Sequence, residues 1–187
     1  MQLHTRLLAS VVLILPLAGL ANASPATDTY DPDACLPLSA NSRSMSPPQL
    51  YRSMLNCLRD GQAAPVLPLY FLGTAYGSFD RARVADNTAH QARPALEMQL
   101  REALGEVEHD RFMGIITELS ADAGKRAPLC QAVASIGPPT YHPSWMINHG
   151  MRQFTGSNEP DLVADFDPAA AWQAVLDNYL KCAVQAG

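Results

Sequence analysis

The strongest constraint on this 187-residue chain is a set of four cysteines that all follow an N-terminal export signal. An apolar run from Leu7 to Leu20 is followed by an A-x-A sequence that ends at Ala23, which is typical of a signal-peptidase site. The run is shorter than the ~20 apolar residues that a membrane-spanning helix needs. We therefore expect residues 1–23 to be cleaved, leaving a periplasmic or secreted protein with no stable membrane anchor.

In an oxidising compartment, an even number of cysteines is expected to pair into disulfides. The cysteines are widely spaced and include no CxxC pair, which argues against a zinc or haem site built on them. Four cysteines allow three connectivities, of which we favour Cys35–Cys57 with Cys130–Cys182. The first bridge would tie an extended N-terminal arm, residues 24–46, to the first helix. The second would close the C-terminal half of the chain on itself.

Apolar residues recur at helical spacing through residues 47–187, and no segment alternates as an exposed strand does. Ser46 and Pro47 are typical of a helix start and Gly61 of a helix end. Gly73 and Gly77 lie four residues apart and indicate a close helix crossing. The expected helices cover the ranges 47–60, 65–91, 94–107, 110–123, 127–136, 143–154 and 168–182. The sequence predicts a single all-α domain, a bundle of five to seven helices held by two disulfides.

The charge balance excludes one class of partner and favours another. The chain has 13 Lys+Arg and 18 Asp+Glu, a net charge of −5. Removing Arg6 with the signal leaves 12 Lys+Arg against 18 Asp+Glu, or −6. A nucleic-acid-binding protein needs a basic face, so we expect no nucleic-acid partner. A protein partner with a basic surface would instead be attracted over a long range.

The segment from Gly137 to Gly150, GPPTYHPSWMINHG, concentrates aromatic and imidazole side chains on a proline-rich loop. Such a composition is typical of a recognition surface. The candidate binding residues are Tyr141, His142, Trp145 and His149. The alternative is that Trp145 anchors the loop to the core while Tyr141 and the histidines satisfy hydrogen bonds.

A second candidate is a polar stripe at steps of three or four residues. It consists of Asp80, Arg83, Asp86, Asn87, His90 and Arg93. On one continuous helix these side chains would share a face. That face would be either simply solvated or a charged binding surface, with Asp80, Arg83, Asp86 and His90 as its candidate residues.

No motif in the sequence identifies a catalytic residue, a metal site or a cofactor site. His142 and His149 are seven residues apart, roughly 10 Å along a straight helix, which is too far to share one ion. An enzymatic alternative remains a small periplasmic hydrolase that uses His90 with Asp86, or His142 with His149. Thr88 could complete a hydroxyl–imidazole–carboxylate set with the first pair.

The layout of an exported, acidic, all-α and disulfide-bonded chain resembles the periplasmic immunity proteins that neutralise secretion-delivered bacterial toxins. The resemblance lies in the architecture, and no motif carries a residue role over to this chain. It implies a non-enzymatic binding protein whose partner is a toxin, contacted through the Tyr141–His149 loop or the Asp80–Arg93 stripe.

Overall fold

The structure, a computed structural model of the chain, describes residues 30–156 and 158–182. The predicted signal, its cleavage site and the first residues of the arm lie outside these ranges. Within them the fold is all-α, as the sequence predicts, and its only β-type pairing is an isolated bridge between Val84 and Leu162. The eight α-helices are α1 (Pro47–Arg59), α2 (Val66–Arg83), α3 (Ala92–Leu104), α4 (Glu106–Ala121), α5 (Ala123–Ile136), α6 (Ser144–Ile147), α7 (Arg152–Thr155) and α8 (Pro168–Ala174). Two 3₁₀ turns, η1 (Ala40–Ser44) and η2 (Asn87–Gln91), and a π-helical turn, η3 (Val175–Tyr179), complete them.

Helix α1 begins and ends where the sequence predicts. Pro47 occupies its first position, and the Gln49 side chain accepts a hydrogen bond of 2.8 Å from the Ser46 backbone N–H. After the last residue, Arg59, Gly61 takes φ of +71°, a left-handed conformation that glycine adopts without steric cost.

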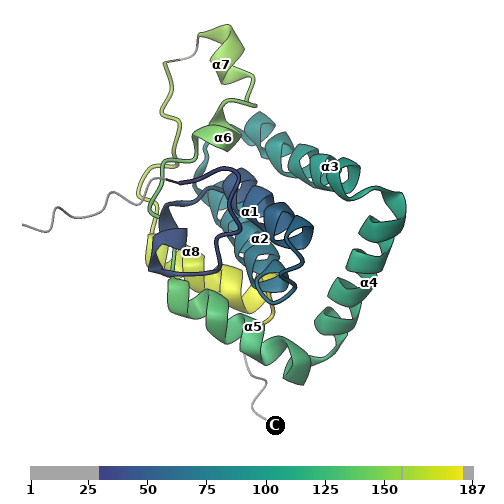
Figure 1. The fold of residues 1–187 in the computed structure, drawn as a ribbon. Coiled ribbons are helices and arrows are strands. Elements are labelled where there is room, and N and C mark those ends of the chain that lie inside the picture. Colours follow the sequence, from purple (N-terminus) through teal and green to yellow (C-terminus); the bar gives the residue numbers. More distant parts are fainter. Residues whose placement is uncertain (1–29, 157, 183–187) are drawn as a thin grey trace, which may run out of the picture.

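Helix α2 lies at the centre of the bundle and is buried on almost every side (Figure 1). It packs closely along α1, because Gly73 leaves room for the Tyr51 ring. A Cβ atom at Gly73 would lie 2.5 Å from Tyr51 Cε1. The second glycine, Gly77, lies against the side chain of Arg93 from α3. The two glycines thus make room for side chains of two different helices, whereas the sequence predicted one close crossing of helix backbones at both.

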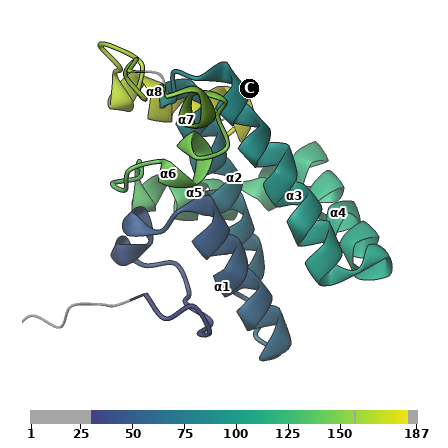
Figure 2. The same cartoon turned by 90° about the horizontal axis from the view of Figure 1, so that it is seen from above.

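Helices α3, α4 and α5 follow one another around one flank of the α1–α2 pair (Figures 1 and 2). Gly105, with φ of +76°, makes the corner between α3 and α4. Asp122 ends α4 and caps α5 by accepting a hydrogen bond from the Lys125 backbone N–H. This cap starts α5 at Ala123, earlier than the expected residue 127. Among the helices longer than ten residues, α4 is the least supported by the core, because Phe112 is its one buried residue.

Both favoured disulfides are confirmed. Cys35–Cys57 joins the arm to α1, and Cys130–Cys182 joins α5 to the residues after η3. Their sequence separations of 22 and 52 residues close loops of the size for which each bridge contributes roughly 3–4 kcal/mol. In the described ranges, no helix combines the length and apolar character that crossing a membrane requires.

Contacts with other parts of the chain end one expected helix early and interrupt another. The expected helix 65–91 ends at Arg83, because the chain beyond it pairs with the segment at Leu162. Ala85 donates to the carbonyl of Asp161, and Val163 donates to that of Arg83, both at 2.9 Å.

The expected helix 143–154 is instead two single turns, α6 and α7. Gly150 separates them, and its backbone lies so close to Asp86 that a Cβ atom there would be 2.4 Å from the carboxylate.

Removing each disulfide by a double Cys→Ala substitution should lower the free energy of unfolding by roughly 3–4 kcal/mol, with the larger loss for Cys130/Cys182 because its loop is longer. Urea unfolding of the two variants and of the unsubstituted protein measures this order. Equal stability of all three proteins would contradict it.

Candidate functional site

The carboxylate of Asp80 organises the segment that follows α5. Asp80 lies in the last turn of α2 and is 0% exposed. Its Oδ1 accepts a 2.8 Å hydrogen bond from Arg83 Nε. Its Oδ2 accepts one of 2.7 Å from the Tyr141 hydroxyl and one of 2.6 Å from the Trp145 indole N–H. One buried carboxylate thus binds both the end of α2 and two rings of a distant segment.

Arg83 completes this cluster. Its side chain is 11% exposed, and its guanidinium lies 5.2 Å from the centres of both the Phe79 and Tyr141 rings. Arg83 Nη2 also donates to the Tyr141 carbonyl at 2.9 Å. We call Asp80, Arg83, Tyr141 and Trp145 the Asp80 cluster. In it, the ion pair, the hydrogen bonds and the cation–π contacts all fix the same loop.

Burial raises the pKa of Asp80, while the Arg83 charge and the three hydrogen-bonding side chains act to lower it. Because the pKa of Asp80 is raised in the folded state, ionisation of this carboxyl group favours the unfolded chain, in which water surrounds it. A buried ion pair of this kind is weak evidence for stability, but breaking it is costly because one charge remains unpaired. The cluster therefore serves to select one arrangement of the loop.

The expected polar stripe is wrong as a single surface. Asp80 is fully buried and Arg83 mostly so, and neither belongs to an exposed binding face. The stripe is also divided between two elements, because α2 ends at Arg83 and Asp86 begins the separate turn η2. Sequence spacing placed these residues on one helix, but the bridge to Leu162 ends that helix first.

For Tyr141 and Trp145, the structure favours the anchoring interpretation. Both rings are partly buried against the core, and the polar atom of each is bound to Asp80. Between and beyond them, Pro143 and Met146 are fully buried. His142 and His149 remain exposed, so they are the members of the predicted loop set that a partner could reach freely.

Asp86 forms a second attachment. Its Oδ1 accepts hydrogen bonds from the Thr88 backbone N–H at 2.9 Å and from the Thr88 hydroxyl at 2.6 Å. Its Oδ2 accepts one of 3.1 Å from the Arg152 backbone N–H, and the Thr88 hydroxyl accepts one of 2.8 Å from Met151. The first turn of η2 therefore holds the start of α7, with Gly150 packed between them.

Arg152 closes the surface loop that begins after Gly150. Its side chain forms a 2.7 Å ion pair with Glu159 and donates to the Pro160 carbonyl at 3.1 Å. The following residues, 161–163, pair with the chain just after α2. The chain thus leaves the bundle near Gly150 and returns beside its point of departure, as a compact surface loop does.

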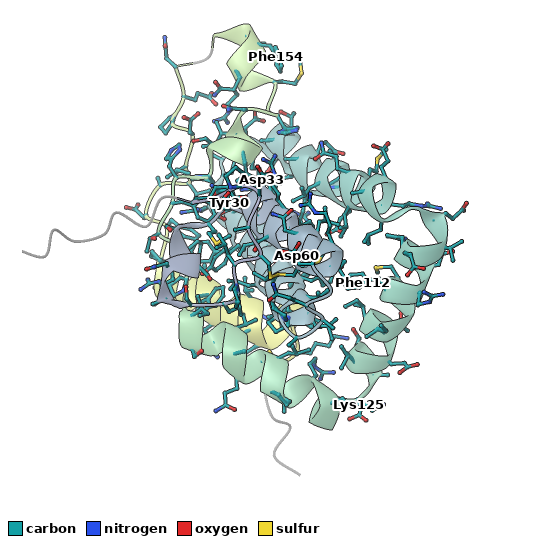
Figure 3. All side chains as sticks on the ribbon, viewed as in Figure 1. Tyr30, Asp33, Asp60, Phe112, Lys125 and Phe154 are labelled. Atoms are coloured by element: carbon teal, nitrogen blue, oxygen red, sulfur yellow. A yellow bond between two sulfur atoms is a disulfide. The ribbon has the colours of Figure 1, made fainter. Side chains whose placement is uncertain are left out.

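This loop presents apolar side chains to solvent. Phe154 is 75% exposed and Met151 is 55% exposed, and Val163 is also exposed. Figures 1 and 3 show α7, with the Phe154 side chain, outside the helical bundle. Val163 lies where the loop returns to the bundle, and we call Met151 and Phe154 the apolar apex. Asp86 and Thr88 hold the start of this segment, and Asp80 holds the rings of Tyr141 and Trp145 that precede it in the chain.

The sequence interpretation missed these three residues. It placed Met151 and Phe154 at the end of a short helix, residues 143–154, and Val163 in a loop, residues 157–166, and gave none of them a role. A usable signal was present: Gly150 and Gly156 bracket only five residues, too few for a stable helix of its own.

The histidines do not form the pairs that the hydrolase alternative needs. His90 Nε2 lies 3.2 Å from the Val84 carbonyl, and His149 Nδ1 lies 2.8 Å from the Trp145 carbonyl. A carbonyl oxygen only accepts, so these two nitrogens must carry protons. His142 Nδ1 instead contacts the Ser144 hydroxyl at 3.0 Å. Asp86, whose oxygens are bound by Thr88 and Arg152, does not orient His90.

A shallow hollow of about 270 Å³ lies beside the loop. Trp145 and His149 line it on one side, and Pro48 and Leu96 line it from α1 and α3. Trp145 therefore serves both as an anchor and as part of an accessible wall. Among residues 30–156 and 158–182, no group of three or more His, Cys, Asp or Glu side chains is placed to hold a metal ion.

In comparisons with known proteins, no protein-family model, curated protein or solved structure matches the chain.

Replacing Asp80 by Asn should lower the free energy of unfolding by about 3–5 kcal/mol, because Arg83 would be left with its charge unpaired in a mostly buried position. Urea unfolding gives this value. Asp60→Asn, an exposed position outside the cluster, is the matched control and should change little. Equal stability of the two variants would show that Asp80 does not hold the loop.

The Asp86 attachment should respond to acid in a defined direction. The Thr88 hydroxyl is the main cause that lowers the pKa of Asp86, and the Arg152 backbone N–H adds to it. A lowered folded-state pKa means that the contribution to stability is complete above the ordinary value of 3.8 and is lost as pH falls through the lowered one.

We therefore expect the amide NMR signals of Thr88 and Met151 to stay constant down to about pH 3.8 and to move below it. The measurement is made in a Glu159→Gln variant, so that titration of the other carboxylate paired with Arg152 does not contribute. In Thr88→Ala the change should begin at a higher pH. If these signals move well above pH 3.8 in the protein that keeps Thr88, Asp86 does not have a lowered pKa.

Proposed function

We propose that this protein is an exported, non-enzymatic binding protein that recognises a protein partner through the apolar apex and the neighbouring histidines, His142 and His149. The partner class that we infer is a toxin acting outside the cytoplasm, which the protein would neutralise by covering its active site. Two disulfides support an oxidising compartment as the place of action.

The observation that carries this proposal is the exposure of Phe154 on a segment attached at both ends. Large aromatic side chains at the centre of an interface supply much of its binding energy. A loop already held in one conformation loses less entropy on binding. Here Asp86 and Thr88 hold the start of the segment and the Asp80 cluster holds the loop that precedes it, while Phe154 and Met151 stay free to enter an apolar pocket of a partner.

The net negative charge of this chain supports a partner with a basic surface. The mature chain is acidic, and exposed carboxylates of Asp161 and Asp165 lie on the same excursion as the apex. The single cation near them, Arg152, is paired with Glu159. A basic active-site rim would therefore be attracted during encounter, and apolar contact with Phe154 would then retain it.

The test uses a panel of purified bacterial toxins that act in the periplasm and whose catalytic activities can be measured. The unsubstituted protein should inhibit one of them, and Phe154→Ala should weaken binding by about 30-fold or more, because a central aromatic anchor contributes roughly 2 kcal/mol or more. Met98→Ala on α3 is the matched control, since Met98 is also an exposed apolar residue but lies far from the apex in sequence.

Isothermal titration calorimetry separates the outcomes. Loss of affinity in Phe154→Ala with retention in Met98→Ala supports the proposal, provided that thermal unfolding of both variants is unchanged. Equal affinity of the two variants would refute the apex as the contact. Absence of any inhibition, with a deletion strain no more sensitive than its parent, would refute the toxin-binding function.

A further inference from the structure

The shallow hollow beside Trp145 is formed where helices α1, α3 and α6 meet. Pro48 lines it from the first turn of α1, Ala92 and Leu96 line it from α3, and Trp145 lines it from α6. Its volume of about 270 Å³ is just below the roughly 300 Å³ at which small-molecule sites begin. The hollow is therefore suited to one ring-sized group and not to a larger ligand.

One side of the hollow is apolar and firmly held. Ala92 and Leu96 are four residues apart, so they share a face of α3, and both pack into the core. The Trp145 indole N–H donates to Asp80, so the ring offers carbon atoms to the hollow. Because the same hydrogen bond holds the ring, this wall is in place before a ligand binds, which reduces the entropy lost on binding.

The other side of the hollow consists of the exposed, neutral polar side chains of Gln99, Asn148 and His149. Each amide group offers both hydrogen-bond donors and an acceptor. His149 Nδ1 lies 2.8 Å from the Trp145 carbonyl and carries the proton between them. In the neutral ring, Nε2 is therefore an acceptor. The polar side can thus both donate hydrogen bonds to a ligand and accept them from it.

The hollow has no formally charged side chain in its lining. Among residues 30–156 and 158–182, no Asp, Glu, Lys or Arg lines it. Asp80, which binds the Trp145 ring, is fully buried and paired with Arg83. An ionic ligand would lose hydration here without gaining an opposite charge. The lining therefore favours a neutral ligand.

A pyranose sugar combines the properties that this lining requires. Its ring C–H groups form an apolar surface, and the hydroxyls around its edge both donate and accept hydrogen bonds. Aromatic rings attract C–H groups, because the ring face carries partial negative charge. A purely apolar ring of the same size would displace water from the three polar side chains without replacing the lost hydrogen bonds.

We propose that this hollow is a binding site for one neutral pyranose ring. The C–H groups of the sugar pack against Trp145 and Leu96, and its hydroxyls bond to the side chains of Gln99, Asn148 and His149.

This site goes beyond the proposed recognition of a toxin. It uses neither Met151 nor Phe154, and only His149 belongs to both. The experiment needs no toxin, so a failure of sugar binding is distinguishable from a failure of toxin binding.

The experiment titrates the full mature protein with the methyl glycosides of glucose, galactose, mannose and N-acetylglucosamine, one at a time, and follows the amide NMR signals. At least one glycoside should give saturable shifts at residues 92–99 and 145–149, at millimolar concentrations. If none of the four gives saturable shifts at these residues, the proposal is overturned.

Cyclohexanol separates recognition of a sugar from simple apolar binding. It has a six-membered ring but only one hydroxyl, so it cannot form the set of hydrogen bonds that a sugar forms. Its affinity should be at least about fivefold weaker than that of the best glycoside, the equivalent of one hydrogen bond or more. Equal affinity would show that the hollow recognises only apolar surface, and would contradict the proposal.

Two variants then locate the contacts. Gln99→Ala should weaken binding of the best glycoside roughly fivefold, because one hydrogen-bonding side chain is lost. Gln131→Ala is its matched control, since Gln131 is also an exposed helical glutamine but lies on α5, outside the hollow.

His149→Ala should have an effect of similar size, and His142→Ala is its control, because His142 is exposed on the same loop but does not line the hollow. A loss in either test variant, with both controls and all thermal unfolding temperatures unchanged, supports the site. Unchanged affinity in both Gln99→Ala and His149→Ala would refute it.

Discussion

A carboxylate taken out of water must find hydrogen bonds and an opposite charge, and Asp80 finds them on two parts of the chain at once. Arg83 lies one turn further along the same helix, whereas Tyr141 and Trp145 come from about 60 residues away. Because an unpaired buried charge is so costly, arrangements of the chain that leave Asp80 without these partners are excluded. The path of the segment after α5 follows from this one requirement. Asp86 then fixes where that segment leaves the bundle.

The parts of the fold that depend on neighbouring residues could be predicted from the sequence. Ser46, Pro47 and Gly61 set the ends of α1 through backbone geometry alone, and Gly73 indicated a close contact that the Tyr51 ring makes. The favoured disulfide pairing, one of three possible, tied the N-terminal arm to the first helix and closed the C-terminal half on itself, and both bridges are present. Asp80 could not be placed in the same way. Helix α2 is buried nearly all round, so it has no polar face whose period would reveal which of its charges point inward.

The proposed recognition surface was harder to predict for a related reason. The sequence indicated the neighbouring segment, and it named as contact residues Tyr141 and Trp145, whose rings anchor that segment to Asp80. Aromatic side chains serve equally as anchors and as contacts. Only the position of Asp80 decides between these roles here. The residues that reach solvent, Met151 and Phe154, follow a glycine whose close packing on Asp86 cannot be deduced from spacing. The C-terminal end of α2 thus fixes the segment that leads to the proposed recognition surface.

The central claim, that Asp80 fixes the loop containing Tyr141 and Trp145, is tested most directly by hydrogen exchange at the Trp145 indole N–H. This proton lies between the indole nitrogen and Asp80 Oδ2, 2.6 Å apart. If the cluster holds the loop, the proton exchanges only when the whole protein unfolds, at the rate of the slowest amides in α2. The apolar apex amides near Phe154 exchange much faster. Exchange of the indole proton at the rate of a free indole, while α2 stays protected, would contradict the account.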